Sequence, residues 1–258
     1  MRVFRILPAA AAAALLLLAG CTRELKTATV ADEGEVPMPG GYKASMSYKY
    51  SMEYVTGGLP KHVMDNINEQ IVSYGIFYES EEALHDVPAA CRQWVEMHIA
   101  GYEADTEDFA EEFEEEQAWM FNWSFDLDGK FYTACKARNW QTYCVNGDDY
   151  TGGAHGLYAT TYIVLDLKTG GIISEEDFLD MDASEELCDL IYDKVLEELD
   201  EEMWDAIYEI PTLNGNFCVD DEGVTWLYNP YEIGPYVLGS LTARLSWDDL
   251  APYLLATD

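Results

Sequence analysis

The residues best suited to chemistry include a histidine set among glycines. His155 follows Gly152 and Gly153, with Tyr150 and Tyr158 on either side. An imidazole beside tyrosines is suited to contacting a ligand or to acting as a general base. The alternative is structural, because glycines permit positive φ in a turn and His155 then bonds to the backbone. The sequence leaves both interpretations open.

A second candidate is the aromatic segment Tyr-Glu-Ile-Gly-Pro-Tyr at residues 231–236. Rigid aromatic side chains on a proline-stiffened loop are good anchors for a protein partner, because they lose little entropy on binding. The alternative is a packed loop that fixes the last two strands. Together, the two segments supply eight candidate ligand-binding residues: Tyr150, Gly152, Gly153, His155, Tyr231, Glu232, Pro235 and Tyr236.

Motifs that define common catalytic centres are absent from the sequence. It has no Gly-x-Ser-x-Gly elbow and no His-Glu-x-x-His pair. Asp and Glu are so abundant that carboxylate pairs carry no information about glycosidase chemistry. Residues 126–129 resemble the start of a calcium loop but lack its later ligands, so Asp128-Gly129 is predicted to be a hairpin turn. We expect no cofactor, no metal and no catalytic centre.

The first residues have the anatomy of a bacterial export signal. Arg2 and Arg5 precede an apolar run that is too short to span a membrane permanently. The run ends in Leu-Ala-Gly-Cys at residues 18–21, which resembles a lipobox. We expect residues 1–20 to be a signal peptide and acyl chains on Cys21 to anchor the protein at the cell envelope. The alternative is an ordinary signal peptide followed by an incidental cysteine.

The charge of the chain restricts its partners. The 258 residues carry 14 basic and 49 acidic side chains, a net charge of −35, which becomes two units more negative without Arg2 and Arg5. This field repels nucleic acid and attracts cationic proteins. The alternative is that the acidity only keeps the protein soluble.

The cysteines after Cys21 permit one disulfide prediction. Outside the cytoplasm disulfides are stable. Cys135 and Cys144 lie in β-like runs, and a two-residue turn at Asn139-Trp140 would place them opposite each other. The pairing of the others is left open: Cys91, Cys188 and Cys218.

The first half of the chain is predicted to be a tether followed by a strand and helices. Residues 21–41 are polar or small with several Gly and Pro, which indicates a flexible tether. Alternation over 46–54 predicts a strand with one buried face, and apolar spacing over 63–74 predicts a helix. Ser80 is a candidate cap for a second helix. Residues 103–116 indicate an acidic helix with Phe109 and Phe113 facing inward.

The second half is predicted to be rich in strands. The expected elements are strands at 119–125, 131–136, 140–145 and 158–167, a helix at 184–210, strands at 225–227 and 239–245, and a helix beginning after Ser246. The helix at 184–210 is expected to turn Leu187, Ile191, Val195 and Leu199 inward. This order indicates an α+β fold of helices packed on antiparallel sheets, in two closely associated subdomains.

Three segments together resemble known envelope domains. Residues 54–71, with Gly-Gly and Asn-Ile-Asn-Glu-Gln-Ile, resemble the opening of the non-catalytic N-terminal domain of the deacetylase PdaC. Residues 150–170, beginning Tyr-Thr-Gly-Gly-Ala-His-Gly, resemble the signature of the RsiV-type extracellular domain. Residues 231–239 and then 248–250 resemble the C-terminal motif of that domain.

The resemblance implies a PdaC-like portion at 42–118 and an RsiV-like α+β domain at 119–258. RsiV is a lysozyme-binding anti-sigma factor, so the resemblance implies a non-catalytic module that binds a lysozyme-like cationic protein or a cell-wall component such as peptidoglycan. The sequence lacks an internal transmembrane helix and a deacetylase domain, so we expect neither RsiV-type signalling nor deacetylation. The alternatives are a glycan-modifying enzyme that uses His155 and a carboxylate, or a structural lipoprotein of an envelope assembly.

The lipid anchor gives the first testable prediction. Native protein extracted from membranes should lack residues 1–20, and mass spectrometry should find acyl chains on Cys21. Cys21→Ala should leave the protein without lipid. A native protein of unmodified mass that keeps its first twenty residues would contradict the prediction.

Overall fold

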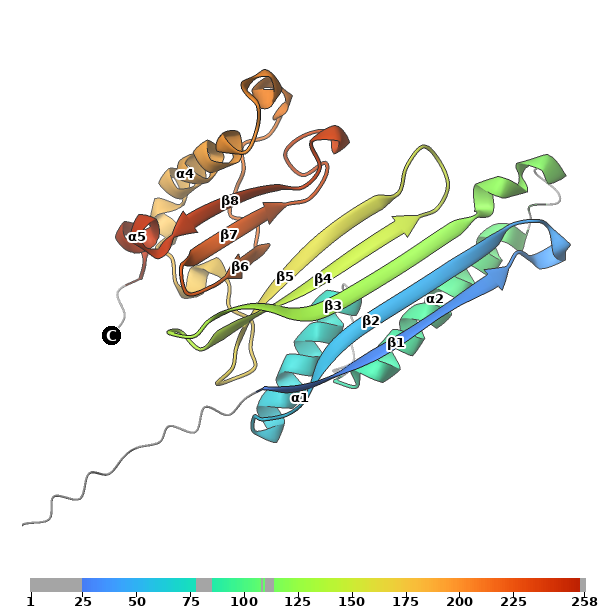
Figure 1. Cartoon of the computed structure of the whole chain (residues 1–258), viewed down its shortest axis with the longest axis horizontal. Helices are drawn as coiled ribbons and strands as arrows, with labels where there is room; N and C mark the ends of the chain where they lie inside the picture. The colour runs from blue at the N-terminus through green and yellow to red at the C-terminus, as the bar shows by residue number, and fades with distance from the viewer. Residues whose placement is uncertain (1–24, 78–84, 108, 110–113, 256–258) are drawn as a thin grey trace, which may run out of the picture.

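The computed structural model describes residues 25–77, 85–107, 109 and 114–255. Its strands and helices are β1 (Lys26–Pro37), β2 (Ser45–Gly57), α1 (Lys61–Gln70), α2 (Val87–Glu107), β3 (Trp123–Cys135), β4 (Trp140–Tyr150), β5 (Leu157–Asp166), α4 (Ser184–Glu197), β6 (Phe217–Val219), β7 (Gly223–Tyr228), β8 (Leu241–Ser246) and α5 (Trp247–Leu250). One sheet has the order β1-β2-β3-β4-β5, and a second has the order β6-β7-β8 (Figure 1). The α+β prediction is therefore confirmed.

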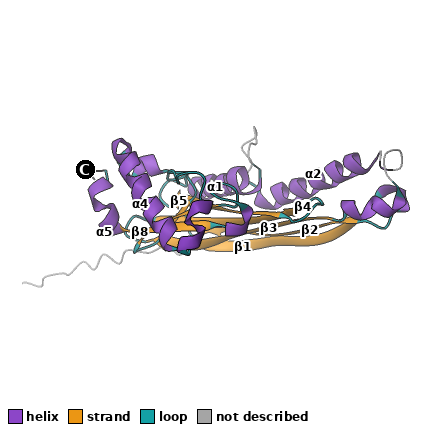
Figure 2. Cartoon of the chain, turned by 90° about the horizontal axis from the view of Figure 1, so that it is seen from above, coloured by secondary structure: helices purple, strands orange, loops and turns teal. Residues whose placement is uncertain are grey.

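The parallel pairing of β2 with β3 determines where the first two helices lie. Parallel neighbours need a long crossover, whereas antiparallel neighbours can be joined by a tight turn. Here the crossover contains α1 and α2, and both pack on the same face of the five-stranded sheet (Figure 2). Polar side chains occupy much of the opposite face of this sheet. The expectation of purely antiparallel sheets is wrong at this one pair.

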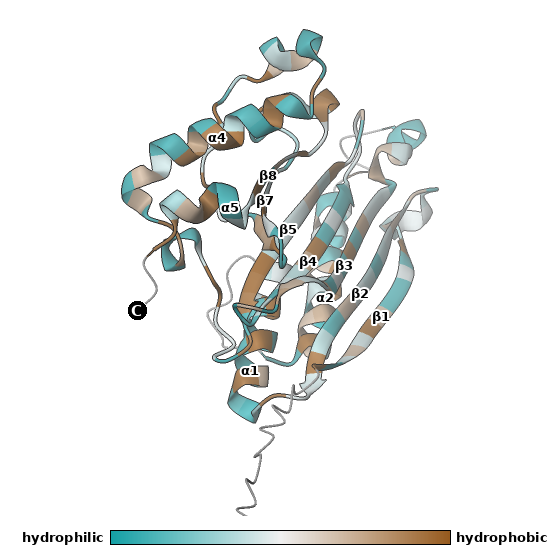
Figure 3. Ribbon diagram, turned by 60° about the vertical axis from the view of Figure 1, so that its left-hand side comes forward, coloured by the Kyte–Doolittle hydropathy of each residue, from teal (hydrophilic) through white to brown (hydrophobic). Residues whose placement is uncertain are grey.

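The first hydrophobic core lies between this sheet and its helices. Met46, Tyr50 and Met52 of β2 are buried, as the alternating pattern predicts, and they share the core with Val63 and Ile67 of α1. Hydrophilic and hydrophobic residues alternate along the strands in Figure 3. This alternation leaves one apolar and one polar face on the sheet.

The second sheet has a core of its own against α4 and α5. Leu187, Ile191 and Val195 of α4 are fully buried there, as predicted. Ser246 caps α5 through its hydroxyl, which accepts from the amide of Asp249 at 3.1 Å. Among the described residues, no helix is long and apolar enough to cross a membrane.

The tether prediction is wrong for most of its length. Lys26–Pro37 forms β1, which pairs with β2 from end to end. The strand was not evident in the sequence because it lies at the edge of the sheet and none of its residues is fully buried. Backbone pairing and cross-strand bonds hold it, such as that from Thr27 Oγ1 to Glu53 Oε1 at 2.5 Å. The lipobox and the proposed anchor at Cys21 lie outside the described residues.

Three helix predictions need correction. The helix predicted at 184–210 ends at Glu197, since further carboxylates follow where the helix dipole is negative. The acidic segment 103–116 begins inside α2, which ends at Glu107. Phe109 follows this helix and is buried as predicted, while Phe113 lies outside the described residues. Ser80 also lies outside them.

The start of α2 and the end of α1 also differ from prediction. The carboxylate of Asp86 accepts from the amide of Ala89 at 3.0 Å and so takes the capping role at the start of α2. Tyr74 is 56% exposed because Ile71–Ile76 forms a π-helical turn, which rotates it off the apolar face.

Two β predictions are wrong because tertiary packing decides them. Asp128-Gly129 lies inside β3 and makes no turn; an added Cβ on Gly129 would lie 2.5 Å from Tyr143 Oη, so close packing explains the glycine. Consequently 131–136 is not a separate strand. Trp119 is 58% exposed in a short 3-10 helix, and β3 begins only at Trp123.

The predicted disulfide is also wrong. All described cysteines are free thiols. The turn between β3 and β4 takes four residues, so Cys135 pairs with Trp140, while Cys144 pairs with Lys130. The register therefore separates the two sulfur atoms along the sheet.

The predicted subdomain boundary between 118 and 119 falls within the crossover that links two neighbouring strands of one sheet. β2 and β3 pair across it, so residues 42–118 form no sheet of their own. The two hydrophobic cores divide elsewhere: the second contains Cys135, Trp140 and Val164 of the first sheet together with residues of the second sheet and its helices.

A buried asparagine provides a test of how β2 is held to α1. Asn68 is 8% exposed; its amide accepts from the Val55 N–H and donates to the Val55 carbonyl, both at 2.9 Å. Asn68→Ala leaves these groups unpaired, so it should lower the free energy of unfolding by about 2 kcal/mol in urea titrations. Asn66→Ala, which removes one exposed bond to Thr169, is the control and should cost clearly less. Equal losses would contradict the prediction.

Candidate functional site

Two loops that are far apart in the sequence meet at one exposed point. One connects β4 to β5, and the other follows β7. The His155 ring stacks on Tyr236 with 4.0 Å between ring centroids, and Tyr231 Oη lies 3.4 Å from His155 Nε2. Tyr158 packs edge-on against Tyr236 at 5.8 Å. We call His155, Tyr158, Tyr231 and Tyr236 the aromatic cluster.

The β4–β5 loop takes its shape from its glycines. Gly152 and Gly153 have φ values of 93° and 97°, a region that favours glycine. Tyr150 Oη donates to the Gly153 carbonyl at 3.1 Å and so braces the loop. His155 Nδ1 lies 2.8 Å from the Gly156 carbonyl, which can only accept, so Nδ1 carries the proton. Nε2 is then free to accept from the Tyr231 hydroxyl.

Two asparagines hold the second loop beside the first. The Thr160 N–H of β5 donates to the side chain of Asn229, and the Tyr162 N–H donates to that of Asn216, each at 2.8 Å. Both side-chain amides donate back to the Thr160 carbonyl. These amides replace a neighbouring strand at the edge of the sheet, and they fix the start of the loop that carries Tyr231.

Tyr231 is held in a strained backbone conformation. Its φ of 73° is left-handed, which costs a non-glycine residue on the order of 1–2 kcal/mol. Tyr208 Oη donates to its carbonyl at 2.7 Å, and half of its side chain stays exposed. Strain of this kind on an exposed aromatic residue is typical of a functional position.

The remaining predicted site residues have structural partners. Glu232 accepts from the side-chain amides of Asn214 and Asn229 at 3.0 and 3.3 Å, so its carboxylate braces the loop. Pro235 is half-buried and precedes the short helical turn that carries Tyr236. The predicted residues are therefore brought together: the rings of His155, Tyr231 and Tyr236 gather in the aromatic cluster, while the other five residues shape the two loops.

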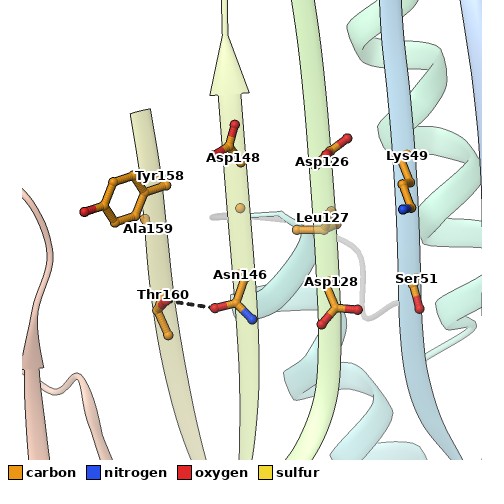
Figure 4. A pocket seen from close by; sticks show the side chains of 11 residues that line it. Lys49, Ser51, Asp126, Leu127, Asp128, Asn146, Asp148, Tyr158, Ala159 and Thr160 are labelled. Atoms are coloured by element: carbon orange, nitrogen blue, oxygen red, sulfur yellow. Dashed lines mark hydrogen bonds between the residues drawn. The ribbon is translucent and has the colours of Figure 1, made fainter. Parts of the chain in front are cut away.

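A polar groove of about 500 Å³ lies next to the cluster on the sheet face opposite α1 and α2. Its side chains come from four neighbouring strands in two rows (Figure 4). The first row is Lys49, Asp126, Asp148 and Tyr158; the second is Ser51, Asp128, Asn146 and Thr160. Tyr158 belongs to both the groove and the aromatic cluster, so the two surfaces are continuous.

The groove carries unbalanced negative charge. Asp126 and Asp148 are directly opposite each other on β3 and β4, an arrangement that repels. On the other face of β4, partial burial raises the pKa of Asp149, and the charges of Asp148 and Asp126 raise it further against a lowering effect of His98. A cation placed in the groove would relieve this repulsion.

The arrangement is suited to binding. In the described part of the chain, no group of His, Cys, Asp and Glu side chains forms a metal site. Burial raises the pKa of the Cys91 thiol to about 12 and raises those of Cys135, Cys144 and Cys218, which makes these sulfur atoms poor nucleophiles. His155 is oriented by a backbone carbonyl, whereas a general base in a catalytic triad is oriented by a carboxylate.

Sequence reasoning missed the residues that join the two loops. Asn216, Asn229 and Tyr208 gave no periodic signal, because they act through side-chain bonds to backbone atoms that are distant in sequence. The turn sequences Asn-Gly-Asn at 214–216 and Asn-Pro at 229–230 were the only available signals.

The fold and site define an α+β protein whose two sheets meet beside an exposed aromatic site. Residues 176–248, which include α4 and the second sheet, match the family model described as protein of unknown function (DUF3298). No curated protein matches the sequence.

Two solved structures have a similar fold. A member of the DUF3298 family from Bacteroides fragilis is 21% identical, with a TM-score of 0.76 over 91% of this chain and 95% of that chain. A DUF3298 family protein from Pseudomonas aeruginosa is 17% identical, with a TM-score of 0.61 over 91% and 96%. At these identities the likeness concerns the fold alone. None of these three matches names RsiV or PdaC.

Paired glycine substitutions test how the β4–β5 loop positions His155. An added Cβ on Gly152 would lie 2.7 Å from the Met120 carbonyl oxygen, whereas one on Gly153 would meet nothing within 4 Å. Gly152→Ala should therefore cost about 2–3 kcal/mol of unfolding free energy, and Gly153→Ala, which strains only the backbone, about 1 kcal/mol. Denaturant titration of both variants would measure this difference, and a larger loss in Gly153→Ala would contradict it.

Proposed function

We propose that this protein is a non-catalytic binding module of the bacterial cell envelope and that the aromatic cluster is its contact surface. One observation carries the proposal. Two loops about eighty residues apart hold exposed His155 and Tyr231 together with half-buried Tyr236, and Tyr231 has a strained backbone conformation. Packing alone does not require exposed rings to be strained in this way.

The proposed partner is a cationic envelope protein. The net charge of −35 and the acidic groove beside the cluster favour a positively charged surface and would speed its encounter with this chain. The sequence resemblance to the RsiV-type domain, with a PdaC-like N-terminal portion, supports a lysozyme-like protein as the concrete candidate. The proposed lipid on Cys21 would hold the module where such a protein acts.

A cell-wall polysaccharide is a second candidate ligand. Polar side chains from four strands line the groove, and Tyr158 lies at its edge, an arrangement suited to hydroxyl groups and a sugar ring. The same surface is the basis of the alternative that the protein modifies peptidoglycan.

Titration with lysozyme tests the proposal. The full chain should bind lysozyme, and binding should weaken as salt rises from low to moderate concentration. His155→Ala and Tyr236→Ala should each weaken binding about tenfold, because each removes a stacked ring from the contact surface. Calorimetry or surface plasmon resonance would measure the dissociation constants.

Tyr74→Ala is the control, since Tyr74 is an exposed aromatic residue that lies on the helix side of the sheet. It should bind as the unmodified protein does. Absence of binding at both salt concentrations, or binding unaffected by both cluster variants, would remove lysozyme as the partner. If the unmodified protein released sugars from purified cell wall and the His155→Ala variant did not, an enzyme would be favoured instead.

A further inference from the structure

An aromatic groove lies on the helix side of the five-stranded sheet, apart from the aromatic cluster. It has a volume of about 390 Å³, within the range of small-molecule sites. It runs between α2 and β3 and is lined by Met97, His98, Gly101, Tyr102, Asp105, Trp123, Phe125 and Thr151.

The rings that line the groove pack against one another at steep angles, and Tyr102 and Phe125 are buried. Tyr102 and Trp123 meet at 67° with centroids 5.4 Å apart, and Trp123 and Phe125 meet at 82° with centroids 6.4 Å apart. The His98 ring lies 4.2 Å from Phe125 and is tilted by 54°. Among these four rings, those of His98 and Trp123 are partly exposed to the groove.

The polar atoms of these rings already have backbone partners. Tyr102 Oη donates to the Phe121 carbonyl at 3.0 Å, and Trp123 Nε1 donates to the Met120 carbonyl at 3.1 Å. His98 Nδ1 bonds to the Trp94 carbonyl at 2.8 Å. The groove therefore offers the partly exposed rings of His98 and Trp123, and its tyrosine hydroxyl and indole N–H are not available to an anion.

Gly101 is unexplained by packing. It lies in the interior of the 21-residue helix α2, where glycine is less favourable than alanine. An added Cβ would meet nothing within 4 Å, so no neighbouring atom requires the glycine. Its effect is to keep one wall of the groove open.

The charge around the groove selects the ligand. Asp105 is exposed and is the only carboxylate among the lining residues, and no Lys or Arg lines the groove in the part of the chain that the structure describes. Aromatic faces attract cations through their quadrupoles, most strongly when a carboxylate is nearby.

We propose that the aromatic groove binds a small organic cation, a quaternary or alkyl ammonium compound. The partly exposed rings of His98 and Trp123 would contact its methyl or methylene groups, Asp105 would balance its charge, and Gly101 would leave it room. This site shares no residue with the aromatic cluster, although Thr151 at its edge belongs to the loop that carries His155.

Calorimetry with choline and its neutral carbon isostere, 3,3-dimethyl-1-butanol, tests the assignment on the full chain in a non-ionic detergent. Choline should bind about tenfold more tightly than the neutral isostere, because only the cation gains from the rings and from Asp105. Asp105→Asn should weaken choline binding severalfold, and Gly101→Leu should abolish it. Glu103→Gln, an exposed acidic residue of α2 outside the groove, is the matched control and should change nothing.

Folding of the variants is checked separately. Gly101→Ala and Gly101→Leu should raise the melting temperature by about 2–4 °C, because both residues favour a helix interior over glycine. Three outcomes would overturn the proposal. They are the absence of choline binding at millimolar choline, equal binding of the neutral isostere, and unchanged choline binding in a folded Gly101→Leu variant. Tighter binding of a lysine-rich peptide, abolished by Gly101→Leu, would overturn the small-ligand assignment in favour of a polypeptide.

Discussion

Paired hydrogen bonds between two asparagine side chains and the free edge of β5 are the constraint on which the rest of the site depends. An edge strand presents unpaired N–H and C=O groups. Asn216 and Asn229 pair with both groups of Thr160 and with the N–H of Tyr162 without adding a strand. They join the second sheet to the first at this point, and they fix the loop that brings Tyr231 to His155.

The two faces of the five-stranded sheet then have different roles. The crossover between β2 and β3 places both helices on one face, where they bury the apolar side chains. The opposite face keeps its acidic groove, because the second sheet packs only near the β3–β4 hairpin end, around Cys135, Trp140 and Val164. The aromatic cluster lies at the edge of that open face. Charge and aromatic surface are therefore adjacent, a combination that suits a cationic partner.

Much of the fold was predictable wherever one side-chain pattern decided it. The alternation in β2, the helical spacing of Leu187, Ile191 and Val195, and the cap at Ser246 all appear as predicted. Predictions failed where a feature depended on atoms far away in sequence. β1 is held by backbone pairing with β2. The glycine at 129 is explained by its contact with Tyr143, and the β3–β4 register is set by a four-residue turn and a bulge.

The sequence by itself determined the α+β class, the acidity and the two segments that carry His155 and Tyr236, because composition and local spacing are written into neighbouring residues. Only the tertiary structure decided that these segments touch, that Glu232 braces its loop while Tyr231 stays exposed, and that the aromatic groove exists. Such contacts join residues that no local periodicity relates. They depend on strand order and on which polar groups must find partners once the chain is folded.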